Sequence, residues 1–158
     1  MAKIGFIGLG IMGHPMAGHL QQGGHDLFVL KRAKPTPPDI LDGGAVECAT
    51  SSEVAGKAEI IITMVPDTPD VEQVLFGPEG VADGLSPGKL VIDMSSISPT
   101  ATREFAGRIN ELGCLYLDAP VSGGQIGAQN AALTIMIGGP QEAFERASPL
   151  FQLMGKNI

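Results

Sequence analysis

The 158-residue chain has little of what several classes of protein require. It contains only two cysteines, Cys48 and Cys114, which stand far apart and form no C-x-x-C pair. It has 10 lysines and arginines against 17 aspartates and glutamates, whereas a nucleic-acid-binding protein is expected to carry a basic surface. Nowhere do 18 apolar residues follow one another, so no membrane-spanning segment is predicted. We therefore expect a protein of a reducing compartment whose partners include neither nucleic acid nor membrane.

The first residues lack the succession of charged leader, apolar region and cleavage site that marks a signal peptide. Lys3 leads directly into apolar residues and glycines. We therefore expect a cytoplasmic protein. Hydrophobic residues make up 44% of the chain and charged residues 17%, which predicts a folded chain of one domain rather than a disordered one.

Several catalytic motifs are also missing. The Walker motif of nucleotide hydrolases ends in Gly-Lys-Ser/Thr, but here Gly88-Lys89 is followed by leucine. Ser122 lies in a segment close to a hydrolase nucleophile elbow, yet that triad needs a histidine after the serine. No histidine follows it, no pair has i,i+4 spacing, and no cysteine–histidine cluster exists, so no metal site is predicted. The three histidines are His14, His19 and His25.

Short apolar runs alternate with helical patterns along the chain. The runs are continuous, as in strands that are covered on both faces. Between them, apolar residues recur at helical spacing around Met16, Val71, Phe105 and Phe151. The repeated β-α-β order predicts an α/β fold with a doubly wound, mostly parallel, Rossmann-like sheet in a single domain. The predicted strands are Ile4–Ile7, Leu27–Leu30, Val46–Cys48, Ile60–Met64, Leu90–Met94 and Leu115–Asp118.

Two segments depart from this pattern. Three prolines within Pro35–Pro38 oppose a helix where a crossover helix would usually begin, so we predict a loop and at most a short helix near Asp39–Asp42. Leu133–Ile137 is predicted to be core. After Gly155 ends the last helix, Lys156–Ile158 resembles the start of another element, and we expect residues 1–158 to be one domain of a longer enzyme.

Three glycines follow the first predicted strand in the G-x-G-x-x-G spacing of dinucleotide-binding turns, with a strand before and a helix after. The first would permit the tight turn, the second would let the backbone approach a pyrophosphate, and the third would let the helix pack close to the strand. The phosphates would lie on the free N–H groups at the helix start. We predict a cofactor site formed by Gly8, Leu9, Gly10, Ile11, Met12 and Gly13.

Other candidate residues follow later strands, because ligands of this fold bind beyond the carboxyl ends of the strands. At Asp67, and at Ser98 or Thr100, helix N-capping is the alternative to ligand contact. The glycines after the sixth strand would also suit a simple turn, although their amides and the nearby hydroxyl suit a carboxylate. We expect the nicotinamide side of the cofactor at Met64, Val65, Pro66 and Ser96, and a substrate carboxylate at Ser122, Gly123 and Gly124.

The end of the second strand favours NADP. An NAD site has an acidic residue roughly 20 positions past the glycines that holds the ribose 2′-hydroxyl. Here Lys31 and Arg32 stand at that place, and Asp26 lies at the other end of the strand. Two cations suit a 2′-phosphate, and an arginine binds it with paired hydrogen bonds. We predict that NADPH is preferred over NADH; a solvated surface pair is the alternative.

Four segments together resemble the β-hydroxyacid dehydrogenase family. Gly5–Ala17 is similar to its cofactor motif, Thr63–Asp67 and Ile92–Ile97 to its nicotinamide-side segments, and Asp118–Gly124 with Gly127-Ala128 to its substrate motif. The resemblance implies hydride transfer from NADPH to an aldehyde carbonyl. Val65–Pro69 and Val74–Gly77 resemble in particular the members that reduce tartronate semialdehyde.

The same resemblance implies a second, all-helical domain after Ile158 that carries a lysine as general acid. It then follows that residues 1–158 contain no catalytic residue, and that the full-length enzyme is a homo-oligomer acting on a small molecule. One departure is Ala131-Ala-Leu133 in place of Gly-Thr-Leu, because alanine resists a positive φ that glycine accepts. Two alternatives stay open: a reductase of the 3-hydroxyisobutyrate or succinate semialdehyde type, and a non-catalytic nucleotide-binding module.

Overall fold

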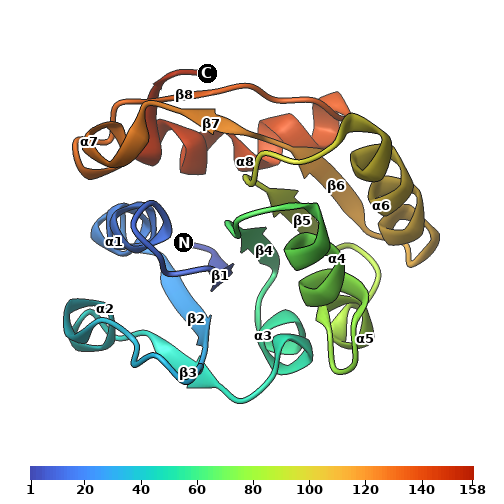
Figure 1. The fold of residues 1–158 in the computed structure, drawn as a ribbon, viewed down its shortest axis with the longest axis horizontal. Coiled ribbons are helices and arrows are strands. Elements are labelled where there is room, and N and C mark those ends of the chain that lie inside the picture. Colours follow the sequence, from blue (N-terminus) through green and yellow to red (C-terminus); the bar gives the residue numbers. More distant parts are fainter.

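A computed structural model describes all residues from 1 to 158. It contains a six-stranded sheet with helices on both faces and a second, three-stranded sheet (Figure 1). The large sheet consists of β1 (Lys3–Ile7), β2 (Asp26–Leu30), β3 (Val46–Cys48), β4 (Ile60–Thr63), β5 (Leu90–Asp93) and β6 (Leu115–Asp118), and the small sheet of β7 (Val121–Ser122), β8 (Leu133–Ile135) and β9 (Gly155–Asn157). The helices are α1 (Gly13–Gln22), α2 (Pro38–Asp42), α3 (Ser51–Lys57), α4 (Thr68–Phe76), α5 (Val81–Gly84), α6 (Pro99–Glu111), α7 (Gly124–Gln129) and α8 (Gln141–Met154).

The large sheet is wholly parallel, in the order β3-β2-β1-β4-β5-β6. This is the dinucleotide-binding arrangement, in which the chain winds outward in two directions from the centre. The predicted Rossmann-like fold is therefore confirmed, and each of the six predicted strands lies within one residue of its observed bounds. The order reverses between β1 and β4, so the crevice where ligands bind in such sheets lies beyond those two strands.

The inner strands of the large sheet send alternate residues into two separate cores. Phe6 of β1 packs on one face together with Phe151 of α8, whereas its neighbour Ile7 packs on the other face together with Phe105 of α6. Ile62 and Ile61 of β4 divide in the same way. Because both faces are covered, successive residues along the inner strands are apolar, which is why their sequences form nearly continuous apolar runs.

Two strands of the small sheet, β7 and β8, have no counterpart among the predicted elements. β7 pairs antiparallel with β8, and β9 pairs parallel with β8. Leu133 and Ile135 of β8 are buried in the core that contains Phe151, as predicted for this stretch, but Met136 is 57% exposed. In Figure 1, α8 lies between the two sheets. The element expected at Lys156–Ile158 is β9.

The helix boundaries follow local capping chemistry. Asp67 caps α4 in a capping box with Asp70, as predicted, and Ser98 rather than Thr100 caps α6. The proline-rich segment forms a loop that ends in the five-residue helix α2, also as predicted. The longest helix, α8, has 14 residues, and no helix combines the length and the apolar character needed to cross a membrane.

Candidate cofactor site

The turn between β1 and α1 tolerates no side chain at two of its three glycines. Gly8 has a φ of +115°, and a Cβ there would overlap the carbonyl oxygen of Met64 at the end of β4. A Cβ on Gly13 would overlap the carbonyl oxygen of Gly8. The first glycine thus permits the turn and the third permits the close approach of α1, as the spacing predicts.

Gly10 differs from its two neighbours in the motif, because a Cβ there would meet nothing within 4 Å. The space above its backbone is open. No side chain caps α1, and its first turn contains no acidic residue. The start of α1 therefore lies beside this space, where the positive end of the helix dipole favours an anion such as a pyrophosphate.

A cavity of about 370 Å³ lies beside this turn. All of its lining residues are among the twelve for which the sequence predicts cofactor contact. Of the remaining two, Leu9 lines adjoining crevices and Lys31 lines a different cavity. The residues that line the 370 Å³ cavity are Gly8, Gly10, Ile11, Met12, Gly13, Arg32, Met64, Val65, Pro66 and Ser96.

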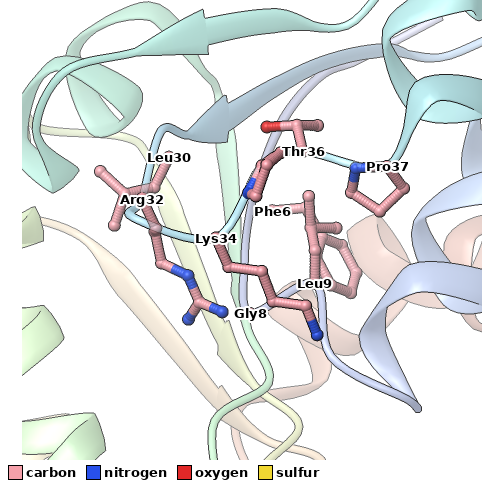
Figure 2. Close-up of a pocket in the computed structure, with 9 residues that line it drawn as sticks. Phe6, Gly8, Leu9, Leu30, Arg32, Lys34, Thr36 and Pro37 are labelled. Carbon is pink, nitrogen blue, oxygen red and sulfur yellow. The ribbon is translucent and has the colours of Figure 1, made fainter.

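Two cations reach the glycine turn, but they are not the adjacent pair that the sequence suggests. Arg32 lines the cavity, and Arg32 and Lys34 together line the crevice next to Gly8. Figure 2 shows both side chains extending toward the same side, near Gly8. Lys31 instead lines a cavity with Thr50, on the other side of the strand end. Lys34 is therefore a cation beside the glycine turn that is absent from the residues predicted from the sequence.

A buried hydrogen-bond network fixes the other wall of the cavity. Thr63 Oγ1 donates to Asp93 Oδ1 over 2.9 Å, and the backbone N–H of Ser95 donates to the same oxygen over 3.0 Å. The backbone N–H of Val65 donates to Ser95 Oγ over 2.9 Å. Since Val65 lines the cavity and Ser95 precedes Ser96, which also does, Asp93 indirectly positions both segments.

The acidic residues at this edge of the sheet are perturbed by burial. Asp93 is fully buried, and desolvation raises the pKa of its carboxyl. Its Oδ2 and the hydroxyl of Tyr116 are both buried without a hydrogen-bond partner. Asp118 lies opposite Asp93 across β5 and β6, and burial together with the Asp93 charge raises the pKa of Asp118 to about 6. Burial, with Asp93 and Asp118 nearby, also raises the pKa of Tyr116.

The three residues expected to hold a substrate carboxylate lie apart from the cavity. Ser122 is in β7, where it pairs with Thr134, and Gly123 and Gly124 have φ values of +135° and +64°. All three are exposed and none lines the cavity. The helix that follows them, α7, does reach the glycine turn, since its residues Gln125 and Gln129 share a crevice with Gly10 and Ile11.

The histidines have structural partners. His14 donates to the carboxylate of Asp39, and His19 Nε2 donates to the carbonyl of Ala128 in α7 over 2.8 Å. His25 Nδ1 accepts from the backbone N–H of Ala2 over 3.0 Å. No three side chains of histidine, cysteine, aspartate or glutamate gather in a way that would hold a metal ion.

Comparison with known proteins agrees with this geometry. Residues 3–158 match the family model described as the NAD binding domain of 6-phosphogluconate dehydrogenase. The chain is 54% identical to 2-hydroxy-3-oxopropionate reductase of Escherichia coli over 99% of its own length and 53% of the relative's length. It thus spans about half the length of the curated relatives that it matches.

Solved structures agree as well. A 3-hydroxyisobutyrate dehydrogenase of Mycobacterium tuberculosis with L-serine is 35% identical and has a TM-score of 0.92, over 100% of this chain and 53% of that one. A structure described as Psf3 in complex with NADP+ and 2-OPP is 26% identical and has a TM-score of 0.92, over 98% of this chain and 55% of that one. The chain therefore belongs to the family of NAD-binding domains typified by 6-phosphogluconate dehydrogenase, and the resemblance to β-hydroxyacid dehydrogenases is confirmed.

Proposed function

We propose that this chain is the NADP-binding domain of a reductase that converts tartronate semialdehyde (2-hydroxy-3-oxopropanoate) to glycerate. The observation that carries the proposal is the open backbone at Gly10, beside an uncapped helix and a cavity lined by the expected residues. The substrate is proposed from the 54% identity to the reductase of that name. The cofactor would supply the hydride that reduces the aldehyde carbon.

The residues present fit a dinucleotide. The amides around Gly10 and the start of α1 would hold the pyrophosphate. Met64, Val65, Pro66 and Ser96 would line the nicotinamide side, where the Asp93 network keeps the Val65 backbone in place. Leu9, Ile11 and Met12 would complete the turn. A side chain at Gly10 would project into the open space over the turn that the pyrophosphate is proposed to occupy.

NADPH is the proposed cofactor because cations, and no carboxylate, line the crevice beside Gly8. Arg32 and Lys34 stand there, and Asp26 begins β2 at the opposite end of the strand. A 2′-phosphate would gain charge-assisted hydrogen bonds from the guanidinium. A ribose 2′-hydroxyl would find no acceptor carboxylate among the lining residues of the crevice.

For the substrate, we propose that Ser122, Gly123 and Gly124 hold its carboxylate, as the family resemblance implies. The general acid, a lysine, is proposed to come from a second, helical domain in the full-length protein, because relatives are about twice as long. That acid would protonate the oxygen of the developing alkoxide. The full-length protein is proposed to be a homo-oligomer.

A direct test separates the two parts of the proposal. Titration of the chain with NADPH and NADH, followed by cofactor fluorescence, is expected to give tight NADPH binding and weaker NADH binding. Addition of tartronate semialdehyde to the NADPH-loaded chain is expected to cause no NADPH oxidation. Equal affinities would contradict the cofactor assignment, and turnover by residues 1–158 alone would contradict the missing acid.

A second candidate function rests on one comparison. The 35% identical dehydrogenase of M. tuberculosis is a 3-hydroxyisobutyrate enzyme with bound L-serine, so a 3-hydroxyisobutyrate-type substrate is the alternative. Kinetics of the full-length protein with tartronate semialdehyde, methylmalonate semialdehyde and succinate semialdehyde would decide between them. We expect the highest kcat/KM with the first. Absence of turnover with all three would favour a non-catalytic nucleotide-binding module.

A further inference from the structure

The loop that carries Arg32 and Lys34 has no regular secondary structure of its own. It runs from the end of β2 to the start of α2, and residues 31–35 are all exposed. Two long cationic side chains on a free loop would lose much conformational entropy on binding a phosphate. The structure instead ties this loop down at several points.

One contact joins the loop to the edge strand β3. Thr36 is 7% exposed, and its Oγ1 donates to Glu47 Oε2 over 2.8 Å. At the other end of the loop, the backbone N–H of Lys31 donates to the carbonyl of Cys48 over 2.8 Å. Arg32 and Lys34 therefore lie between two attachments to the same strand. Figure 2 shows Thr36 beyond Lys34 in this loop.

A second contact joins the end of the loop to the glycine helix. His14, the second residue of α1, donates through Nε2 to Asp39, with distances of 2.8 and 2.9 Å to the two carboxylate oxygens. This hydrogen bond lowers the pKa of the Asp39 carboxyl. A further bond, from Gln21 Nε2 to the carbonyl of Ile40 over 2.8 Å, holds α2 against α1. The loop is thereby attached to the helix that begins at the pyrophosphate site.

The prolines restrict the segment between these contacts. Pro35, Pro37 and Pro38 each fix one φ angle near −65° and leave few ways for the loop to rearrange. A loop that is ordered before the ligand arrives does not have to be ordered by it, which improves affinity.

We propose that the Thr36–Glu47 hydrogen bond and the His14–Asp39 pair are positioning contacts for coenzyme discrimination: they hold Arg32 and Lys34 beside the glycine turn, where the 2′-phosphate of NADPH binds. This inference rests on the proposed NADP specificity. It predicts that breaking either contact lowers the affinity for NADPH while leaving that for NADH, which lacks the 2′-phosphate, nearly unchanged.

The test is the ratio of the NADH and NADPH dissociation constants, measured for the whole chain by cofactor fluorescence. Thr36→Val keeps the shape of the side chain and removes the hydroxyl, whereas Thr36→Ser retains the hydroxyl. We expect the valine variant to lower the ratio about fivefold, which corresponds to the net contribution of one hydrogen bond, and the serine variant to restore it. Glu47→Ala breaks the same bond from an exposed position and should have the same effect, even if the valine variant folds poorly.

Asp39→Ala tests the second contact. Asp42→Ala is its matched control, since Asp42 is an exposed acid in the same short helix. We expect a lower ratio for Asp39→Ala and an unchanged ratio for Asp42→Ala. If Thr36→Val and Asp39→Ala raised the dissociation constants of NADPH and NADH by the same factor, or left both unchanged, the ratio would stay at its wild-type value. That result would overturn the inference, and an equal rise would show a merely structural role. A wild-type ratio near one would overturn the NADP proposal itself.

Discussion

The carbonyl oxygen of Gly8 occupies the space that a side chain on Gly13 would need. The turn is therefore closed by contact between its own first and third glycines, whereas Gly10 between them faces open space. Folding thus requires glycine at positions 8 and 13, whereas the requirement for glycine at position 10 is proposed to come from ligand binding.

Two alanine substitutions should separate these demands. In Gly13→Ala the new Cβ would push the backbone of α1 away from the Gly8 carbonyl. The substitution should therefore destabilise the chain by about 3 kcal/mol, near the upper end of the usual range for point substitutions. Gly10→Ala should change stability by less than about 0.5 kcal/mol. It should nevertheless raise the dissociation constant for NADPH at least about tenfold, equivalent to 1.4 kcal/mol. Urea unfolding and fluorescence titration measure the two effects, and loss of stability in Gly10→Ala would contradict the assignment of its role.

The three cations after β2 should differ in their effect on NADPH. Arg32→Ala removes a charge-assisted hydrogen bond and should raise the NADPH dissociation constant about tenfold or more. Lys34→Ala should raise it about fivefold, as loss of a more flexible point charge. Lys31→Ala is the matched control, because Lys31 lines another cavity. The NADPH dissociation constant of this variant should stay within about twofold of wild type. A larger effect at Lys31 than at Lys34 would refute the pairing of Arg32 with Lys34.

The buried acids should make stability depend on pH in an unusual direction. Because the pKa of Asp118 in the folded chain is raised to about 6 from 3.8, the folded state binds this proton more tightly than the unfolded state. Its contribution to stability is therefore present at low pH and is lost as the pH rises through about 6.

Asp118→Asn removes this titration. Relative to wild type, the variant should gain about 1 kcal/mol of stability between pH 5 and pH 7.5, after allowance for solvent screening of a half-buried group. Urea unfolding at both pH values measures the change. A stability difference that stays constant across this window would contradict the raised pKa.

Ala131 adopts a conformation that suits glycine. Its φ is +52°, in the left-handed region where a Cβ costs roughly 1–2 kcal/mol. Ala131→Gly should therefore stabilise the chain by about 0.5–1 kcal/mol, once the greater freedom of unfolded glycine is subtracted. Ala132→Gly is the matched control at a residue without a positive φ, and should destabilise by a similar amount. Thermal unfolding measures both, and equal signs would argue against relief of backbone strain.

The large sheet was open to prediction from sequence because its strands are buried on both faces. Ile60–Thr63 and Leu90–Asp93 are wholly buried, so the predicted strands begin where these strands do and extend only one residue further. β7 and β8 have two and three residues, too few for a periodic signal, and they pair with each other across α7. The start of α3 could also have been predicted, because Thr50 is followed three residues later by Glu53. The backbone N–H of Glu53 donates to the Thr50 hydroxyl.

The part of the candidate site that is formed by backbone could be predicted from the sequence. Gly8, Gly10 and Gly13 follow from spacing, since turn and helix start lie together along the chain. The direction of Lys31, Arg32 and Lys34 depends on how the loop is attached to β3 and α1, which spacing does not contain. The sequence likewise shows Asp93 only as one acid at the end of an apolar run. Its role depends on Thr63 of the neighbouring strand β4 as well as on the nearby Ser95.

If NADPH is the cofactor, as proposed, the cations after β2 make coenzyme choice depend on the length of one short loop. Charge faces the glycine turn from positions 32 and 34, and Lys31 between them and the strand faces away. Because the loop is attached to β3 at Lys31 and at Thr36, one residue inserted between these two attachments would change which side chains face the turn. A single codon gained or lost would then weaken phosphate recognition without altering any residue of the glycine motif.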